Sequence, residues 1–333
     1  MIYLILTCTA LILLNQRISE ASSGDIARKY VNCKHSCINE NCMMLDKPII
    51  KLPDNLRAYT PFSPIWTCPE ICYYDCMMNI TALDIENKAP VKKYHGHWPF
   101  IRFFGLEQPA SVLFSLANTI PHIIHIFSRN ENKRVYYFMT SWLSLVPFIS
   151  LNAWLCSAYF HSKITPFSSL IDYVSALLLI SYSLWLALRR IMGAYVNSKL
   201  VITLFVLYSA LILNRIRLMI QNKISFNSHM TLAILLSCTH IIIWMLWIIY
   251  QCYRKDNNYD KLTRKRTYII IFCQVWFIAA SMFELFDFPP FFGIFDAHSL
   301  WHFATPLLGS LWYYFWRLDA FIESTPKESK CMT

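Results

Sequence analysis

Apolar runs close to 20 residues long dominate the chain after residue 105, and short polar connectors separate them. A helix of about 20 residues spans the hydrocarbon core of a bilayer, because each residue adds about 1.5 Å and the core is about 30 Å thick. The predicted spans are 106–127, 135–160, 169–188, 199–213, 230–251, 267–286 and 298–316. The pattern predicts an all-α membrane protein, with a seven-transmembrane helix bundle at 106–318 and a cytosolic tail at 319–333.

The amino-terminal part has a different pattern. An apolar run from Ile2 to Leu14, followed by Ser19-Glu20-Ala21, is typical of a secretory signal peptide that is cleaved after Ala21. No lysine or arginine precedes the run, so an uncleaved anchor is the alternative. Residues 22–105 are polar and rich in cysteine, and they predict a small luminal domain.

The cysteines of this domain form an even set, which is typical of disulfides made in an oxidising compartment. They are Cys33, Cys37, Cys42, Cys68, Cys72 and Cys76. Cys33 and Cys37 are four residues apart, and so are Cys72 and Cys76. This i, i+4 spacing can staple two antiparallel helices, which would leave Cys42 to pair with Cys68. Six cysteines allow 15 connectivities, and this is one of them. A zinc ribbon is the alternative, but its CxxC spacing is missing. Asn79 opens a glycosylation sequon, in agreement with a luminal position.

Composition and charge support the membrane assignment. Hydrophobic residues make up 56% of the chain and charged residues 15%, with a mean hydropathy of +0.37, whereas a soluble chain has about 25% charged residues. The net charge of +10 is confined largely to connectors, which argues against nucleic acid as a partner. Twelve lysines and arginines lie in the first, third and fifth connectors, against four in the second and fourth. The positive-inside rule therefore places the amino end in the lumen.

Ionisable residues gather at one predicted depth of the bundle. His298 and His302 are four residues apart at the start of the last span, so a helix places both on one face. His161 ends the second span, with Ser157 one turn before it, and Asp172 opens the third span. In the predicted topology all five residues lie just inside the luminal face. Such groups are costly at membrane depth and indicate a functional site.

Three histidines with one open position are a ligand set for catalytic zinc, which activates water for attack on an ester or amide. We therefore predict His161, His298 and His302 as ligands. Asp172 would orient a histidine or accept the proton of the water, and Ser157 would donate to the oxyanion. Each residue alone has a simpler explanation: Asp172 as a helix N-cap and Ser157 in helix packing. Their convergence favours the metal site.

At these residues the chain resembles the post-GPI-attachment remodelling proteins of the third-factor type. The matching stretches are Tyr94–Arg102, Glu107–Val112, Asn152–His161, Met282–Pro290 and Asp296–His302. That family is similar to alkaline ceramidases and adiponectin-type receptors, membrane hydrolases whose Ser-x3-His, Asp and His-x3-His pattern forms a zinc site. The resemblance assigns the same roles to the five residues above. Two stretches depart from the family pattern: Ser162-Lys163-Ile164 and Glu107-Gln108-Pro109.

The resemblance implies a phospholipase A2-type activity that removes the sn-2 acyl chain from the lipid of GPI-anchored proteins. It also implies the Golgi membrane in animals, or the endoplasmic reticulum membrane in yeast, with membrane lipids around the site. One alternative is a ceramidase-like amidase, against which the disulfide-rich domain argues. The other is a non-catalytic chaperone or cargo receptor for GPI-anchored proteins, in which the metal would be structural.

Overall fold

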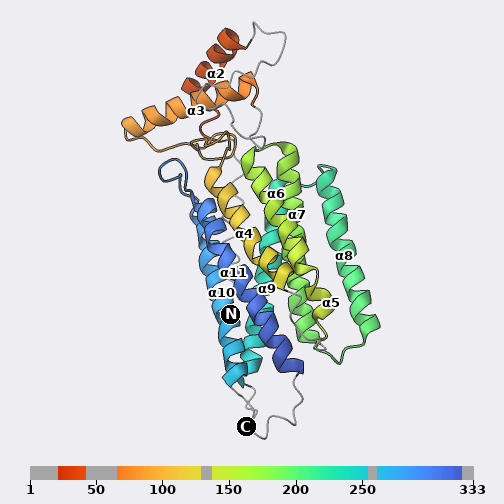
Figure 1. Ribbon diagram of the computed structural model, residues 1–333. Helices are drawn as coiled ribbons and strands as arrows, with labels where there is room; N and C mark the ends of the chain where they lie inside the picture. Colours follow the sequence, from red (N-terminus) through yellow and green to blue (C-terminus); the bar gives the residue numbers. More distant parts are fainter. Residues whose placement is uncertain (1–21, 43–65, 129–136, 254–260, 325–333) are drawn as a thin grey trace.

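The computed structural model describes residues 22–42, 66–128, 137–253 and 261–324, and these residues form two parts (Figure 1). A pair of crossed helices lies at the top of the view, and a bundle of long helices lies below it. The predicted signal peptide lies outside the described residues, and so does the chain after residue 324. The described residues are helical apart from loops and three isolated β-bridges, as the all-α prediction requires.

The small domain consists of α2 (Arg28–Asn41) and α3 (Cys68–Glu86), which are joined by three disulfides. The bonds are Cys33–Cys76, Cys37–Cys72 and Cys42–Cys68. The cysteines advance along α2 as their partners retreat along α3, so the helices are antiparallel. The disulfides expected from the cysteine set are present, in the connectivity that the i, i+4 spacing suggested. Tyr30 is fully buried between the helices, where it packs with Ile80 and Tyr94.

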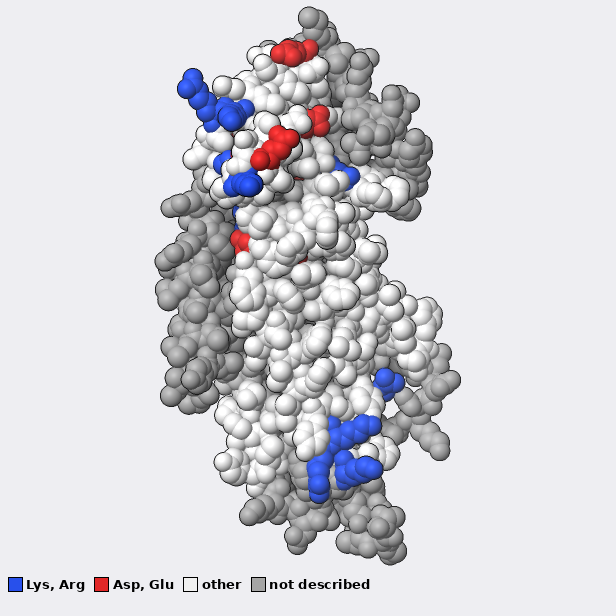
Figure 2. Space-filling view, turned by 90° about the vertical axis from the view of Figure 1, so that its left-hand side faces the viewer, with Lys and Arg blue, Asp and Glu red and all other residues white. Residues whose placement is uncertain are grey.

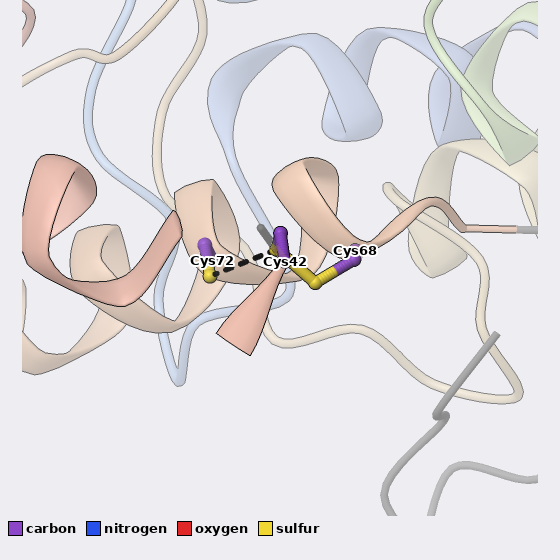
Figure 3. Close-up of side chains that lie close together, drawn as sticks. All are labelled: Cys42, Cys68 and Cys72. Carbon is purple, nitrogen blue, oxygen red and sulfur yellow. Dashed lines mark hydrogen bonds between the residues drawn. A yellow bond between two sulfur atoms is a disulfide. The ribbon is translucent and has the colours of Figure 1, made fainter. Parts of the chain in front are cut away.

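Three sulfur atoms of this domain lie close together without forming a metal site. Cys42 Sγ is bonded to Cys68 and lies 4.0 Å from Cys72 Sγ, as Figure 3 shows. Cys72 is itself bonded to Cys37. A metal binds the thiolate, which an oxidised cysteine cannot supply. The disulfides therefore exclude the zinc-ribbon alternative for these cysteines.

Six helical segments in the described part of the chain are long and apolar enough to cross a membrane, so this is a multi-pass membrane protein. The helices are α4 (Pro109–Phe127), α5 (Thr140–Leu143) continuing into α6 (Val146–Ser162), α7 (Pro166–Met192), α8 (Ser198–Ile220), α9 (Phe226–Tyr253) and α10 (Lys261–Phe286). Figure 2 shows a broad middle zone with almost no charge on the face it presents, between charged upper and lower ends. That distribution suits a bilayer.

The last helix, α11 (Ala297–Ser324), packs against α4 and α10 but is not among those six segments. It is 28 residues long, and its apolar run is interrupted by histidines near its start and by charges near its end. The expected seventh span therefore has the length but not the composition of the others. The helix also runs past the predicted start of the tail at residue 319, because Asp319 and Glu323 are paired within the bundle.

The fourth span was predicted at 199–213, only 15 residues long, and its predicted end is wrong. Helix α8 has 23 residues and continues through Arg215 and Arg217, which were assigned to a connector. Each arginine has a hydrogen-bond partner: Arg215 donates to Ser228 Oγ of α9 at 2.7 Å, and Arg217 donates to Asn214 Oδ1 on α8 itself at 3.0 Å. Charged side chains near a helix end can reach the interface, so they need not end the helix.

The small domain is attached to one end of the bundle, which we call the domain end: the end of α6 and the starts of α4, α7 and α11. Lys163, just after α6, forms an ion pair of 2.9 Å with Glu70 of α3. Lys93 forms another, at 2.5 Å, with Asp287 in the loop before α11. The Ile101 N–H donates to the Gly293 carbonyl at 2.8 Å. Contacts on both sides of the bundle therefore fix the domain.

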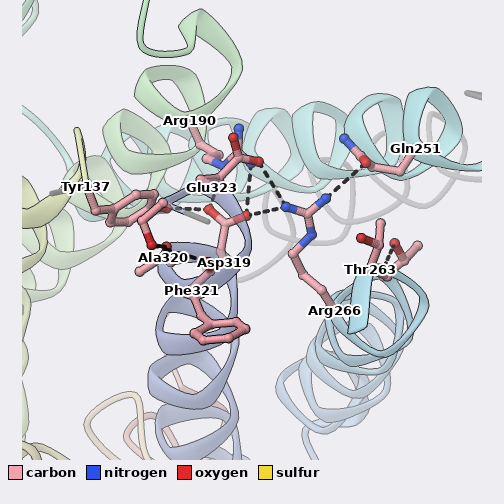
Figure 4. A network of polar contacts seen from close by, with 11 residues as sticks. Tyr137, Arg190, Gln251, Thr263, Arg266, Asp319, Ala320, Phe321 and Glu323 are labelled. Atoms are coloured by element: carbon pink, nitrogen blue, oxygen red, sulfur yellow. Dashed lines mark hydrogen bonds and ion pairs between the residues drawn. The ribbon is translucent and has the colours of Figure 1, made fainter. Parts of the chain in front are cut away.

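At the opposite end, which we call the basic end, α7 and α11 finish and α10 begins. Asp319 is completely buried there and accepts hydrogen bonds from three residues (Figure 4). Arg190 donates to both carboxylate oxygens, at 2.6 and 2.9 Å, and Arg266 donates at 2.7 Å. The third donor is the Tyr137 hydroxyl. Glu323 contacts both arginines, at 2.6 and 3.1 Å. The network joins α7, α10 and α11.

Candidate metal centre

Three histidines converge near the domain end of the bundle. The last turn of α6 supplies His161, and the first two turns of α11 supply His298 and His302. The Nε2 atoms of His161 and His298 are 3.4 Å apart, and those of His298 and His302 are 2.9 Å apart. His161 and His302 are buried, whereas 37% of the His298 side chain is exposed. The structure therefore brings together the three histidines that the sequence predicted as ligands.

The other ring nitrogen of each histidine is held by a different side chain. His161 Nδ1 lies 2.5 Å from Gln108 Oε1, and His298 Nδ1 lies 2.7 Å from Glu284 Oε2. His302 Nδ1 lies 3.3 Å from Ser115 Oγ. Histidines that bind metals almost always use the second nitrogen in this way, which fixes the ring and its tautomer. All three rings are therefore oriented from outside the cluster.

These partners determine which nitrogen carries the proton. Gln108 Oε1 and an ionised Glu284 can only accept hydrogen bonds, so His161 and His298 must donate through Nδ1. When both rings are neutral their Nε2 atoms are then unprotonated, and two lone pairs point toward one another. Such an arrangement is repulsive unless a proton or a metal cation lies between them.

The spacing of the donor atoms fits zinc. Tetrahedral zinc with bonds of about 2.0–2.1 Å to nitrogen holds its ligands about 3.3 Å apart. The Nε2–Nε2 separations of 2.9 and 3.4 Å lie on either side of that value, and all three donor atoms lie within 4.8 Å of one another. Three imidazole ligands with one partly exposed side are the donor set of catalytic zinc sites.

Ser157 and Asp172, which were predicted to assist catalysis, differ in how they contact the histidine cluster. Ser157 Oγ is buried one turn before His161 and lies 3.2 Å from Ser115 Oγ, which itself contacts His302. Ser157 therefore belongs to a hydrogen-bond chain that ends on a predicted ligand. Asp172 is in the second turn of α7, close enough to His298 for their charges to interact. The N-cap of α7 is Thr165, so the simpler explanation of Asp172 as a helix cap does not hold.

A proline in α11 leaves the carbonyl of a predicted ligand without its helical partner. In an α-helix the carbonyl of His302 would accept from the N–H of residue 306, but Pro306 has no N–H. Asn118 Nδ2, on α4, donates to this carbonyl instead, at 2.8 Å. The Thr305 hydroxyl adds a second hydrogen bond at 3.0 Å. The proline thus frees an acceptor that ties the backbone of His302 to α4.

Sequence reasoning missed the contribution of α4, although a signal was present. Polar residues recur along this apolar segment at intervals of three or four, as expected for one face of a helix. They are Gln108, Ser111, Ser115, Asn118 and His122, and all of them are buried. In an apolar helix, such a stripe indicates the face turned toward a polar site. Here it faces α6 and α11, which carry the histidines.

The segment between the small domain and α4 lies above the cluster. His97 is next to Phe160, and burial lowers its pKa to about 4, an effect that a charge on His298 increases. Glu107 accepts from the Ile164 N–H at 2.8 Å, and burial raises the pKa of this carboxyl despite that hydrogen bond. The stretches 107–109 and 162–164 therefore meet each other at the domain end.

The other described histidines of the bundle have partners of their own. His122 Nδ1 lies 2.7 Å from the Tyr313 hydroxyl, and His125 stacks on the same tyrosine. His229 stacks on Tyr173. These residues lie outside the cluster of three. Within the described residues, the histidine cluster is the one group whose donor atoms are available to hold a metal ion.

The fold and the site can now be set beside known proteins. The pattern that defines the Per1-like family matches residues 62–320. This range includes most of the bundle and all three histidines. The chain therefore belongs to the Per1-like family. No solved structure is detectably similar to it.

Named relatives match over nearly their whole length. A fruit-fly (Drosophila melanogaster) protein, post-GPI attachment to proteins factor 3, is 30% identical, with 88% of this chain and 87% of the relative covered. A Chinese hamster (Cricetulus griseus) protein named GPI-specific phospholipase A2-like PGAP3 is 28% identical over 93% of this chain and 92% of its own. The PER1 homolog of Schizosaccharomyces pombe is 29% identical, with 89% of this chain and 86% of the relative covered.

Proposed function

We propose that this protein remodels GPI anchors by hydrolysing the sn-2 acyl ester of their lipid, as a phospholipase A2 does. The names of the relatives support GPI lipid as the substrate. The observation that carries the hydrolytic activity is the meeting of three histidine Nε2 atoms whose Nδ1 atoms are all held from outside. Neutral rings held in this way direct their Nε2 lone pairs at one point, where a metal ion could bind.

In this proposal His161, His298 and His302 hold zinc. When bound, zinc supplies a Lewis acid and a water molecule that is activated near neutral pH. Gln108, Glu284 and Ser115 hold the three rings in place, and Asp172 accepts a proton beside the exposed His298. Ser157 would donate to the developing oxyanion, which requires its hydroxyl to turn away from Ser115.

We further propose that the domain end is luminal and that α11 crosses the membrane as the seventh span. The predicted signal peptide and the charge of the connectors support this orientation, and Asn79 is exposed on α3, where it would carry a glycan. The site would then open on the leaflet that holds GPI-anchored proteins, in the Golgi or the endoplasmic reticulum. A glycosylation site engineered at 254–260 should stay unmodified while Asn79 is glycosylated; the reverse would contradict the orientation.

The central experiment measures two quantities on purified protein: its zinc content and its release of fatty acid from a defined GPI lipid. We expect about one zinc per chain and a free fatty acid from the sn-2 position. Ser157→Ala should keep zinc and fold, yet lower turnover by roughly 100–1,000-fold if the oxyanion assignment is right. Zinc without acyl release would favour the non-catalytic chaperone, and release from ceramide instead would favour the amidase.

A further inference from the structure

His161 lies in the last turn of α6, which ends one residue later at Ser162. The last carbonyls of a helix have no partner within it, so a terminal turn frays unless another segment bonds to it. The helix α11 has a cap of its own, because Asp296 Oδ1 accepts from the Ser299 N–H at 2.8 Å. At the end of α6, by contrast, the chain is already extended at Lys163. His161 therefore depends on support from outside its helix.

The residues just before α4 supply that support. The Glu107 N–H donates to the Ser162 carbonyl, and the Gln108 N–H donates to the His161 carbonyl, both at 3.0 Å. The Glu107 carboxylate accepts from the Ile164 N–H at 2.8 Å. Glu107 thus holds the chain on both sides of the helix end, with its backbone on residue 162 and its side chain on residue 164.

The same two residues also hold the ring of His161. Gln108 Oε1 lies 2.5 Å from His161 Nδ1, so the backbone and the imidazole of this histidine are both bonded to residues 107 and 108. Pro109, which follows, begins α4 and has a fixed φ. A shift of Glu107 relative to α6 would therefore move the backbone and the ring of His161 together. Ligands of a metal site have to be held within about 0.5 Å of their productive positions.

The small domain keeps the carboxylate of Glu107 in place. Arg102 is close enough for its charge to stabilise the ionised form of Glu107. The Arg102 guanidinium lies over the rings of Trp66 and Tyr74, with its Cζ 3.5 and 4.1 Å from their centroids. The Arg102 N–H donates to the Tyr74 hydroxyl at 3.1 Å. Since Tyr74 belongs to α3, the position of Glu107 is tied to the disulfide-bonded helices.

We propose that Glu107 is a positioning residue for the metal centre, which holds the end of α6 so that His161 meets His298 and His302. This inference rests on the proposed function, because it treats His161 as a metal ligand. Glu107 acts through the backbone of α6 and not by contact with an imidazole. A purely structural role would lower stability alone, whereas a positioning role changes the metal site of the folded protein.

The test uses the full-length protein in detergent and cobalt(II), whose visible absorption reports the geometry of its ligands. Glu107→Ala should change the absorption spectrum and weaken cobalt binding about tenfold, at the lower end of the effect typical of outer partners of metal ligands. Glu107→Gln keeps an acceptor oxygen for the Ile164 N–H and should restore most of the affinity and the native spectrum. Asp84→Ala is the matched control, because Asp84 pairs with Lys92 in the small domain and should change neither.

Hydrogen exchange of residues 158–165 gives a second readout, which needs no metal. Exchange should be faster in Glu107→Ala than in the native protein and close to native in Glu107→Gln. Native cobalt affinity and spectrum in Glu107→Ala, even with a lower unfolding temperature, would reduce Glu107 to a cap of α6 and overturn the proposal. A native protein that binds no cobalt would overturn the metal centre itself; faster exchange in Glu107→Ala would then show that Glu107 only caps the helix.

Discussion

The two ends of the bundle hold polar groups in opposite ways. At the basic end, Asp319 is surrounded by Arg190, Arg266 and Tyr137, so both of its carboxylate oxygens accept hydrogen bonds. Near the domain end, three imidazoles turn their Nε2 atoms toward one another, so the neutral rings can share a proton or hold a metal cation between them. The carboxylate at the basic end is paired within the protein, whereas the histidine cluster can take up a cation from outside it. Burial of polar groups in a membrane bundle therefore indicates function only when their hydrogen-bonding capacity is left unfilled.

The largest effect should follow from removing a ligand. His161→Ala, His298→Ala or His302→Ala leaves two imidazoles, so zinc should be absent and acyl release should fall to background. Metal analysis of purified variants, together with fatty-acid release, measures both. His125→Ala is the matched control, because His125 stacks on Tyr313 and lies outside the histidine cluster. Ligand variants that keep both zinc and activity would show that the three histidines do not hold a catalytic metal ion.

Breaking the network at the basic end should affect folding rather than chemistry. Asp319→Asn leaves two buried arginines without full compensation, and losing one partner of such a pair costs about 3–5 kcal/mol. The apolar variant Arg190→Met/Arg266→Met/Asp319→Leu should recover most of that stability, because well-packed apolar residues often replace buried ion pairs. Thermal unfolding and acyl release distinguish the cases. If the apolar variant folds but is inactive, the network has a role beyond structure.

Removing a partner of the histidine rings should give an intermediate effect. Glu284→Ala frees the Nδ1 of His298, and loss of such a partner typically weakens metal affinity by about 10–100-fold. Glu284→Gln retains an acceptor oxygen and should recover part of that affinity. Competition with a chelator measures the zinc dissociation constant. Equal affinities for Ala, Gln and the native residue would show that Glu284 does not orient the ring.

A smaller effect is expected at Pro306 in α11, and a double-mutant cycle with Asn118 tests it. Asn118→Leu removes a donor to the His302 carbonyl and should cost about 1 kcal/mol of stability. Pro306→Ala restores an N–H at the helical position, so the double variant should lose less than Asn118→Leu alone. Thermal unfolding of the four proteins completes a double-mutant cycle. Additive effects would mean that Asn118 does not substitute for the missing helical donor.

The smallest effect concerns the attachment of the small domain. Burial opposes ionisation of Glu70, but the Thr67 N–H and Lys163 outweigh it and hold the pKa of Glu70 below its usual range. The ion pair therefore stabilises the protein above the unfolded pKa of the carboxyl, near 4.5, and is lost as pH falls through the lower folded value. Lys163→Met should cost less than about 1 kcal/mol near neutral pH, because the pair is partly exposed. Thermal unfolding at pH 7 and below pH 4 should show this difference only at the higher pH.

Sequence reasoning located the parts of the site that have a local signature. His298 and His302 share a helix face by spacing alone, and His161 joins them because spans must alternate in direction. The observed cysteine connectivity is the one, among 15 possibilities, that the same helical spacing suggested. The partners from α4 could not be placed in this way, because Gln108 and Ser115 reach the rings only through packing of α4 against α6 and α11.

Helix ends were the weakest predictions, for a physical reason. Hydropathy treats an arginine or aspartate as the end of a span, but Arg215 and Asp319 lie inside helices. The first reaches a polar partner on the surface, and the second is neutralised by arginines from other helices. Those partners come from tertiary structure, which a window of sequence does not contain.

The nested order of the disulfides has a consequence for how the protein is made. The bonds close segments with separations of 26, 35 and 43 residues, one inside the next. All six cysteines precede Pro109, where the first long helix of the bundle begins. A chain that is synthesised from its amino end can therefore complete the oxidised domain while the bundle is still on the ribosome. Lys163 and Asp287 arrive later and meet a surface that is already rigid, so the last helices assemble against a template.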